Sequence, residues 1–164
     1  MPDNILVPTG YGSNILGLER GFDELEGSGE ITVLPRLFAV QAANCAAFVA
    51  AWRAGSDGLV PFATAATVAD AIAALQPVRV AEVLRALRRS RGGVVAVAEE
   101  EIAPALAAFG RLGLFVEPTA ATAGAALTRL LHDRTIGPDQ TTVVVLTGCG
   151  LKSAERVGEL LGLR

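Results

Sequence analysis

The stretch NILVPTGYGSNILG, residues 4–17, decides the fold of this chain. Its apolar run at residues 5–7 is continuous rather than alternating, which is typical of a strand covered on both faces in a parallel sheet. Proline and glycine at residues 8–10 end that run, and a helical pattern begins near residue 14. The order of strand, glycine turn and helix predicts an α/β fold.

The same alternation continues along the whole chain. We expect further strands at residues 37–41, 94–97, 114–117 and 142–146. We expect helices at about residues 14–20, 45–54, 80–90, 99–111, 119–132 and 152–161. Residues 55–67 look like a loop, at a sheet edge or over a site. The prediction is one doubly wound α/β lobe over residues 1–164, with a mostly parallel sheet.

Composition excludes several classes of protein. The 164 residues are enough for about one domain, and 51% apolar residues with a mean hydropathy of +0.45 exclude a disordered chain. A net charge of −3 gives no basic surface for nucleic acid or an anionic membrane. No secretory leader or membrane-spanning run is visible, and two cysteines are too few for a disulfide scaffold. We therefore expect a cytoplasmic protein without nucleic-acid or membrane partners.

In open parallel sheets, ligands bind beyond the carboxyl ends of the strands. The glycine turn after the first strand consists of Gly10, Tyr11, Gly12, Ser13 and Asn14. Glycines allow a sharp turn, and backbone N–H groups at a helix start attract phosphate. No GK[ST] follows, and the third glycine comes too late for GxGxxG. The segment is therefore either a phosphate loop of another kind or a plain strand-to-helix turn.

Two other strand ends carry polar groups. Thr147 is followed by Gly148 and Gly150, so it either hydrogen-bonds a flat heterocycle or begins a left-handed glycine turn. Glu117 ends a strand as either a functional carboxylate or a structurally paired one, and Thr119 is a candidate helix cap. Residues 41–44 and 98–99 lie at the same predicted edge.

The remaining reactive side chains indicate no metal site and no nucleophile. His132 lies near a helix end without partners at metal-ligand spacing, which favours a solvated cap. Cys45 lies in an alanine-rich stretch and is expected to be a small buried residue. Cys149 lies in a glycine loop without an identifiable base beside it.

Taken in order, five segments resemble the carboxyl-terminal part of a pyridoxal-phosphate enzyme of fold type II, the tryptophan-synthase-β family, and are most similar to threonine synthases. They are PTGYGSNILG (8–17), RLFAVQAANCA (36–46), RGGVVAVAEEEI (91–102), GLFVEPTAATA (113–123) and VVVLTGCGLKS (143–153). The family usually has histidine where this chain has Cys149, and its phosphate loop often differs at Tyr11 and Ser13.

The resemblance implies pyridoxal 5'-phosphate as the cofactor of the intact parent and assigns site residues. Its phosphate would bind at Gly10, Tyr11, Gly12, Ser13 and Asn14. Thr147 would hydrogen-bond the pyridine nitrogen, Glu117 would lie near the ring, and residues 41–44 would line the mouth. A neutral hydroxyl at the ring nitrogen suits elimination and replacement chemistry on an amino acid.

The resemblance also implies that an amino-terminal, lysine-bearing region of the family is missing here. The only lysine of the sequence, Lys152, matches the start of the last helix rather than the family's Schiff-base lysine. We therefore expect no catalytic residue in these 164 residues, weak or absent cofactor binding, and no catalysis by the chain alone. The intact parent would be a lyase of amino-acid metabolism that converts phosphohomoserine to threonine and phosphate.

Other interpretations remain open. The parent would alternatively be a dehydratase or similar to a cysteate synthase, or the chain would be a non-catalytic anion-binding or interaction module that keeps the fold. Expected partners are the small amino-acid substrate of the parent and a separate lysine-bearing chain. Apolar surface that the missing part would cover also predicts a homo-oligomer.

Overall fold

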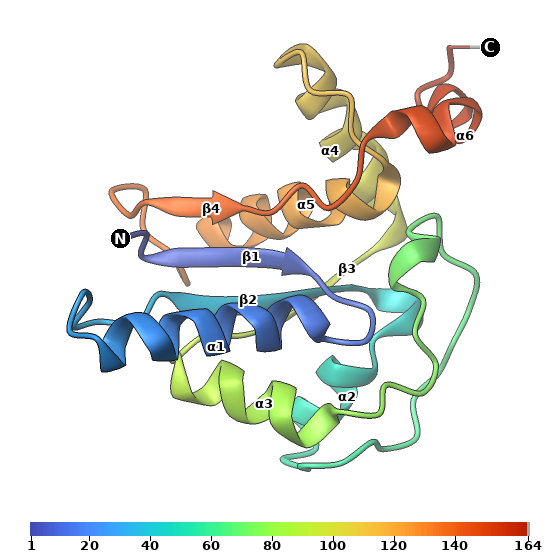
Figure 1. Ribbon diagram of the computed structural model, residues 1–164. Coiled ribbons are helices and arrows are strands. Elements are labelled where there is room, and N and C mark those ends of the chain that lie inside the picture. The colour runs from blue at the N-terminus through green and yellow to red at the C-terminus, as the bar shows by residue number, and fades with distance from the viewer. Residues whose placement is uncertain (164) are drawn as a thin grey trace.

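The computed structural model describes residues 1–163 and contains one parallel sheet between two layers of helices (Figure 1). The strands that it describes lie in the order β3-β2-β1-β4. They are β1 (Asn4–Pro8), β2 (Arg36–Ala42), β3 (Gly93–Val97) and β4 (Thr142–Val144). All pairs are parallel, and Ile5 of β1 is in register with Leu37 of β2 and Val143 of β4. The predicted fold class is confirmed.

Alternate residues of the central strands face different helix layers, which explains their continuous apolar runs. Ile5, Val7 and Leu37 pack in one cluster with α1 (Ser13–Gly27), α2 (Ala47–Arg53) and α3 (Val80–Arg89). Leu6 and Phe38 pack in the other with α4 (Glu99–Arg111), α5 (Pro118–His132) and α6 (Ala154–Leu160). The two layers lie on opposite sides of the sheet (Figure 1).

The strand predicted at residues 114–117 is wrong. Leu114 and Phe115 are almost half exposed, and the segment makes only an isolated antiparallel bridge between Val116 and Cys149. A short apolar run looks the same in sequence whether it is a sheet strand or a connecting segment between helices. The chain turns at Gly113, where φ is +78°, and then pairs with the segment that follows β4. β4 is also shorter than predicted.

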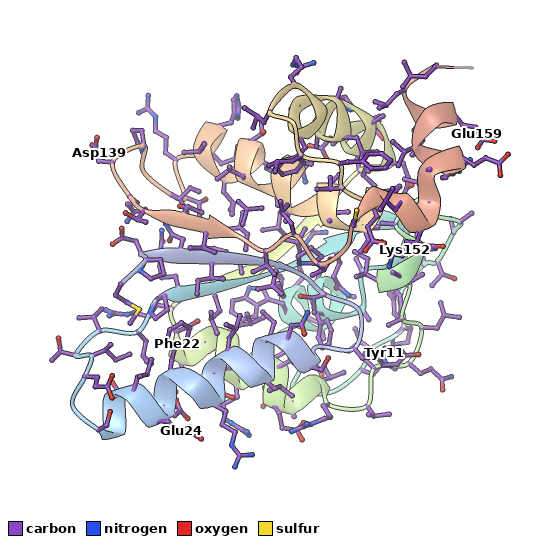
Figure 2. The ribbon with its side chains drawn as sticks, turned by 45° about the horizontal axis from the view of Figure 1, so that its top comes forward. Tyr11, Phe22, Glu24, Asp139, Lys152 and Glu159 are labelled. Atoms are coloured by element: carbon purple, nitrogen blue, oxygen red, sulfur yellow. The ribbon has the colours of Figure 1, made fainter. Side chains whose placement is uncertain are left out.

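The loop prediction at residues 55–67 is confirmed, and this segment belongs to a longer connection between α2 and α3. Asn44, at the carboxyl end of β2, holds it: its Nδ2 donates to the Ala66 carbonyl at 2.6 Å, and its carbonyl accepts from the Ala65 N–H at 2.9 Å. The connection then forms the short 3-10 helix η2 (Asp70–Ile72). Figure 2 shows the side chains over the whole ribbon, with Tyr11 and Lys152 among those labelled.

The two cysteines and the histidine of the chain differ in exposure. Cys45 is buried, which raises the pKa of its thiol, whereas Cys149 is exposed. His132 is exposed at the end of α5, with Nδ1 3.0 Å from the Asp133 carboxylate. In residues 1–163, no group of three or more His, Cys, Asp or Glu is arranged to hold a metal ion, and no helix is long and apolar enough to cross a membrane.

Candidate functional site

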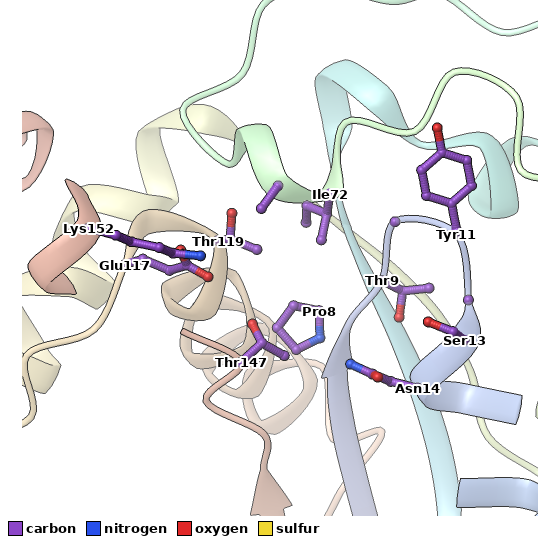
Figure 3. Close-up of a pocket in the computed structure, with 13 residues that line it drawn as sticks. Pro8, Thr9, Tyr11, Ser13, Asn14, Ile72, Glu117, Thr119, Thr147 and Lys152 are labelled. Carbon is purple, nitrogen blue, oxygen red and sulfur yellow. The ribbon is translucent and has the colours of Figure 1, made fainter. Parts of the chain in front are cut away.

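A cavity of about 270 Å³ lies at the carboxyl ends of β1 and β4 (Figure 3). Its size is close to the lower end of small-molecule sites, roughly 300–1,000 Å³. Its lining residues come from five places in the sequence. They are Pro8, Thr9, Gly10, Tyr11, Gly12, Ser13 and Asn14, then Ala71 and Ile72, Glu117 and Thr119, Thr147, and Lys152. All seven site residues expected from the sequence therefore border one cavity.

The loop after β1 forms one end of the cavity and leads directly into α1. Gly12 has φ +89°, and a Cβ there would lie 2.4 Å from Cγ2 of Val83, so both conformation and space require glycine. α1 begins at Ser13, and the backbone N–H groups of a first helical turn have no partners within the helix. No acidic residue lies in that turn. This end of the cavity can bind an anion through main-chain donors and the helix dipole.

The side chains of this loop do not all face the cavity. Ser13 and Asn14 point toward its centre, whereas Tyr11 is 62% exposed and its ring points away (Figure 3). Asn14 and Thr147 lie on either side of Pro8 in the same view. The loop and the Asn14 amide thus face Thr147 across one cavity.

The turn after β4 forms the opposite wall, and its glycines are required for a different reason. Neither Gly148 nor Gly150 has a positive φ, so the left-handed turn considered for this segment is wrong. A Cβ at Gly148 would lie 2.0 Å from Oε1 of Glu117, and one at Gly150 would lie 2.8 Å from the Phe115 ring. Glycine permits close approach here, with the chain in an ordinary conformation.

Glu117 is a buried carboxylate with a cationic partner. Its side chain is 7% exposed, and Oε2 lies 2.7 Å from Nζ of Lys152 in η3 (Gly150–Ser153). This contact raises the pKa of the Lys152 amine above its ordinary value, chiefly through the hydrogen bond and secondarily through the charge of Glu117. Thr119 is not the cap of α5, because Glu117 occupies that position and Pro118 follows it as the first helical residue.

Two other predicted positions do not line the cavity. Gln41 is fully buried, and its Oε1 accepts hydrogen bonds from the backbone N–H groups of Phe48 at 2.8 Å and Val49 at 3.2 Å. It therefore holds the start of α2 instead of a ligand. Glu99 accepts from the Val68 N–H at 2.9 Å and holds the long connection in the same way. None of residues 41–44 lines this cavity.

The cavity also contains residues that the sequence did not indicate as site residues. Ala71 and Ile72 come from η2, which packs closely over Gly10. A Cβ added to Gly10 would lie 3.1 Å from Cα of Ile72. No local pattern connects η2 with the end of β1. Lys152 could be found from the sequence, because it follows Thr147 within TGCGLK. Its position there indicates only the start of a helix.

Comparison with known proteins identifies the architecture. Residues 1–148 match the family model described as "Pyridoxal-phosphate dependent enzyme". The chain is similar to the threonine synthase of Methanocaldococcus jannaschii, with 36% identity over 156 residues, which cover 94% of this chain and 38% of that protein.

Solved structures have the same fold. The Escherichia coli threonine synthase matches 98% of this chain and 36% of its own, with a TM-score of 0.71 and 26% identity. The T.th. threonine deaminase matches 91% of this chain and 50% of its own, with a TM-score of 0.68 and 25% identity. The chain thus spans half or less of the length of these proteins. By the extent of these matches, it belongs to the pyridoxal-phosphate dependent enzyme family.

Proposed function

We propose that this chain is the cofactor-binding part of a threonine-synthase-like enzyme, whose intact form converts phosphohomoserine to threonine and phosphate. The observation that carries the proposal is the convergence of the Gly10–Asn14 loop, Glu117 and Thr147 on one cavity. The threonine synthase of M. jannaschii supports the choice of reaction because its similarity extends over nearly the whole chain.

The cavity fits pyridoxal phosphate in its chemistry. One end offers a helix N-terminus and main-chain donors for a phosphate, with glycine at the position where a Cβ would collide with Val83. The other end offers a hydroxyl from Thr147 beside Gly148, which leaves room for a flat ring close to the backbone. When bound, the cofactor supplies an electron sink for charge that develops at the α-carbon of an amino acid.

In this proposal, the residues of the chain hold and orient the cofactor. The amides that follow Gly12 bind the phosphate, and Asn14 adds a side-chain amide beside it. Thr147 would donate a hydrogen bond from its hydroxyl to the pyridine nitrogen, and as a neutral group it would leave that nitrogen unprotonated. Ala71 and Ile72 form an apolar wall of the cavity and exclude water from that side.

Lys152 does not supply the reactive amine in this proposal. The contact with Glu117 raises the pKa of the Lys152 amine and so disfavours the neutral form that a nucleophilic attack requires. Lys152 is also the only lysine of the sequence. The proposal therefore assigns the cofactor-holding lysine to a segment other than these 164 residues, on the same polypeptide or on a partner chain.

A dehydratase is the second candidate, because the T.th. threonine deaminase shares the fold at 25% identity. A cysteate-synthase-like parent and a non-catalytic anion-binding module are further alternatives. Tyr11 and Cys149 stand where threonine synthases often have other residues. This difference favours testing the alternative reactions as well.

Self-association in a cytoplasmic setting is also part of the proposal. Leu112, at the end of α4, and Leu151, in η3, are 74% and 77% exposed. β4 is an edge strand with Val143 partly exposed. Exposed apolar side chains and a free strand edge favour association. Light scattering at high protein concentration is expected to give a mass above the monomer, and a monomeric mass would contradict this point.

The binding part of the proposal can be tested by following backbone amides during titration. Inorganic phosphate should shift amides of the Gly10–Asn14 loop, and pyridoxamine 5'-phosphate should also shift those around Thr147. Replacing the hydroxyl in Thr147→Val should weaken pyridoxamine 5'-phosphate by about tenfold and leave inorganic phosphate unaffected. Thr128→Val, on an exposed face of α5, is the matched control. A loop whose amides do not respond to either ligand would refute the proposal.

The catalytic part needs a separate assay. Given pyridoxal phosphate and phosphohomoserine, the 164-residue chain should release no phosphate above the protein-free blank. Borohydride reduction in the presence of pyridoxal phosphate should leave Lys152 unlabelled. Turnover, or stoichiometric labelling of Lys152, would refute the assignment of the reactive lysine to another segment.

A further inference from the structure

The ion pair between Glu117 and Lys152 lies on the cavity wall next to Thr147 (Figure 3). Its two members are in different environments, because the Glu117 side chain is 7% exposed and that of Lys152 is 62% exposed. Asp70, on η2, adds a weaker attraction to the Lys152 ammonium. The pair therefore joins a buried acid to a solvated base.

Glu117 has little freedom to leave this position. Its backbone N–H donates to the Gly148 carbonyl at 3.1 Å, and its carboxylate occupies the space that a Cβ at Gly148 would need. The bridge between Val116 and Cys149 continues this pairing on the next residues. The carboxylate is consequently fixed on the wall against which a ring bound at Thr147 would lie.

We propose that Lys152 is a positioning residue that neutralises Glu117, so that an anionic, phosphate-bearing ring compound can lie against the wall at Thr147 and Gly148. This inference rests on the proposed function. An unpaired carboxylate on that wall would repel such a ligand strongly, because a buried charge is poorly screened by solvent. Lys152 removes this repulsion by pairing with Glu117.

The different burial of the two partners predicts an asymmetry. Removing Lys152 leaves a buried, uncompensated anion beside the ligand. Removing the charge of Glu117 leaves an ammonium that water solvates, and an anionic ligand loses nothing from its presence. A pair that only held the two segments together would instead act through the stability of the whole cavity, and its loss would weaken inorganic phosphate and the ring compound alike.

The test measures binding of pyridoxine 5'-phosphate, which has no aldehyde to condense with protein amines and no ammonium group that Glu117 would attract. Lys152→Met should weaken binding about five- to tenfold. Glu117→Gln should weaken binding less than Lys152→Met does, and the double variant should recover most of the loss. Lys152→Arg should retain affinity because it keeps the charge. Arg156→Met, which removes a cation paired with Glu159 on α6 outside the cavity, is the matched control.

Binding of inorganic phosphate is a second measurement. A structural disruption of the cavity would change it, whereas the loss of charge neutralisation at Glu117 would not. Inorganic phosphate needs only the Gly10–Asn14 end of the cavity, so its affinity should stay within about twofold in all variants. Thermal unfolding establishes that each variant is folded before it is titrated.

The failures of the two proposals are distinguishable. If the unmodified chain binds neither ligand, the proposed function fails, and this inference fails with it. If the unmodified chain binds but Lys152→Met and Glu117→Gln lose affinity equally, or Lys152→Met loses none, only the role of Lys152 is refuted.

Discussion

The turns after β1 and β4 meet at one cavity, yet each requires glycine for a different reason. At Gly12 the backbone itself requires glycine, because φ is +89° and the space for a Cβ is occupied by Val83. At Gly148 the backbone is ordinary, and glycine makes room for the carboxylate of Glu117. The first turn depends on its own conformation, and the second depends on a side chain from another segment.

This difference separates two ways of building a ligand site. The β1 turn offers main-chain donors, so its side chains can differ from those of relatives without loss of the binding groups. The β4 turn offers a hydroxyl and an ion pair, so its chemistry depends on the identity of Thr147, Glu117 and Lys152. Substitutions at the two turns should therefore differ in how much unfolding free energy they cost. They should also differ in whether a second substitution restores part of that loss.

The largest effect is expected for Gly12→Ala. A non-glycine residue at this φ, together with the 2.4 Å approach to Val83, should cost about 2–4 kcal/mol of unfolding free energy. Urea denaturation measures this loss. Gly17→Ala is the control: an added Cβ meets nothing within 4 Å inside α1, and the change should stabilise by about 0.5–1 kcal/mol. Equal responses at the two positions would remove the conformational basis of the comparison.

A smaller loss, about 1–3 kcal/mol, is expected for Gly148→Ala because the new methyl group displaces the Glu117 carboxylate. Combining it with Glu117→Ala should cost less than the two single losses together, since the second change removes the obstructing group. Chemical denaturation of the four chains gives this coupling. Strict additivity would show that the β4 turn, like the β1 turn, is limited by its own backbone.

The smallest effect is expected from the pH dependence of the Glu117–Lys152 pair. Because the pKa of Lys152 is raised on folding, the stability that it contributes is fully present below its ordinary value, about 10.4, and is lost as pH rises through the folded value. The difference in unfolding midpoint between the unmodified chain and Lys152→Met should be constant from pH 7 to 9 and should shrink above about pH 10.5. A difference that grows at high pH would contradict the ion pair.

Much of the architecture could be predicted because continuous apolar runs are a local signal of buried parallel strands. The runs around Ile5, Phe38 and Val95 became β1, β2 and β3, each with residues facing both helix layers. The run at residues 114–117 has the same local pattern but lies outside the sheet, with Phe115 packed against Gly150. Its placement depends on the segment after β4, which no local pattern includes.

The candidate site divides in the same way. The loop at Gly10–Asn14 and the ends at Glu117 and Thr147 could be predicted, because strand ends of a parallel sheet meet at one edge. Gln41 lies at the same edge, but its amide holds the start of α2. Residue type at a strand end thus indicates a candidate, and the available partners determine its use.

By itself, the sequence determined the strand–helix alternation and the edge of the sheet that carries the site, because each is encoded by residues close together in the chain. The family resemblance also came from the sequence alone, through five short segments and their order. Only the tertiary structure decided that Ile72 closes over Gly10, that Glu117 lies against Gly148, and that Lys152 pairs with Glu117. These contacts join segments separated by tens of residues. Close packing selects them, and packing depends on the whole fold rather than on local sequence.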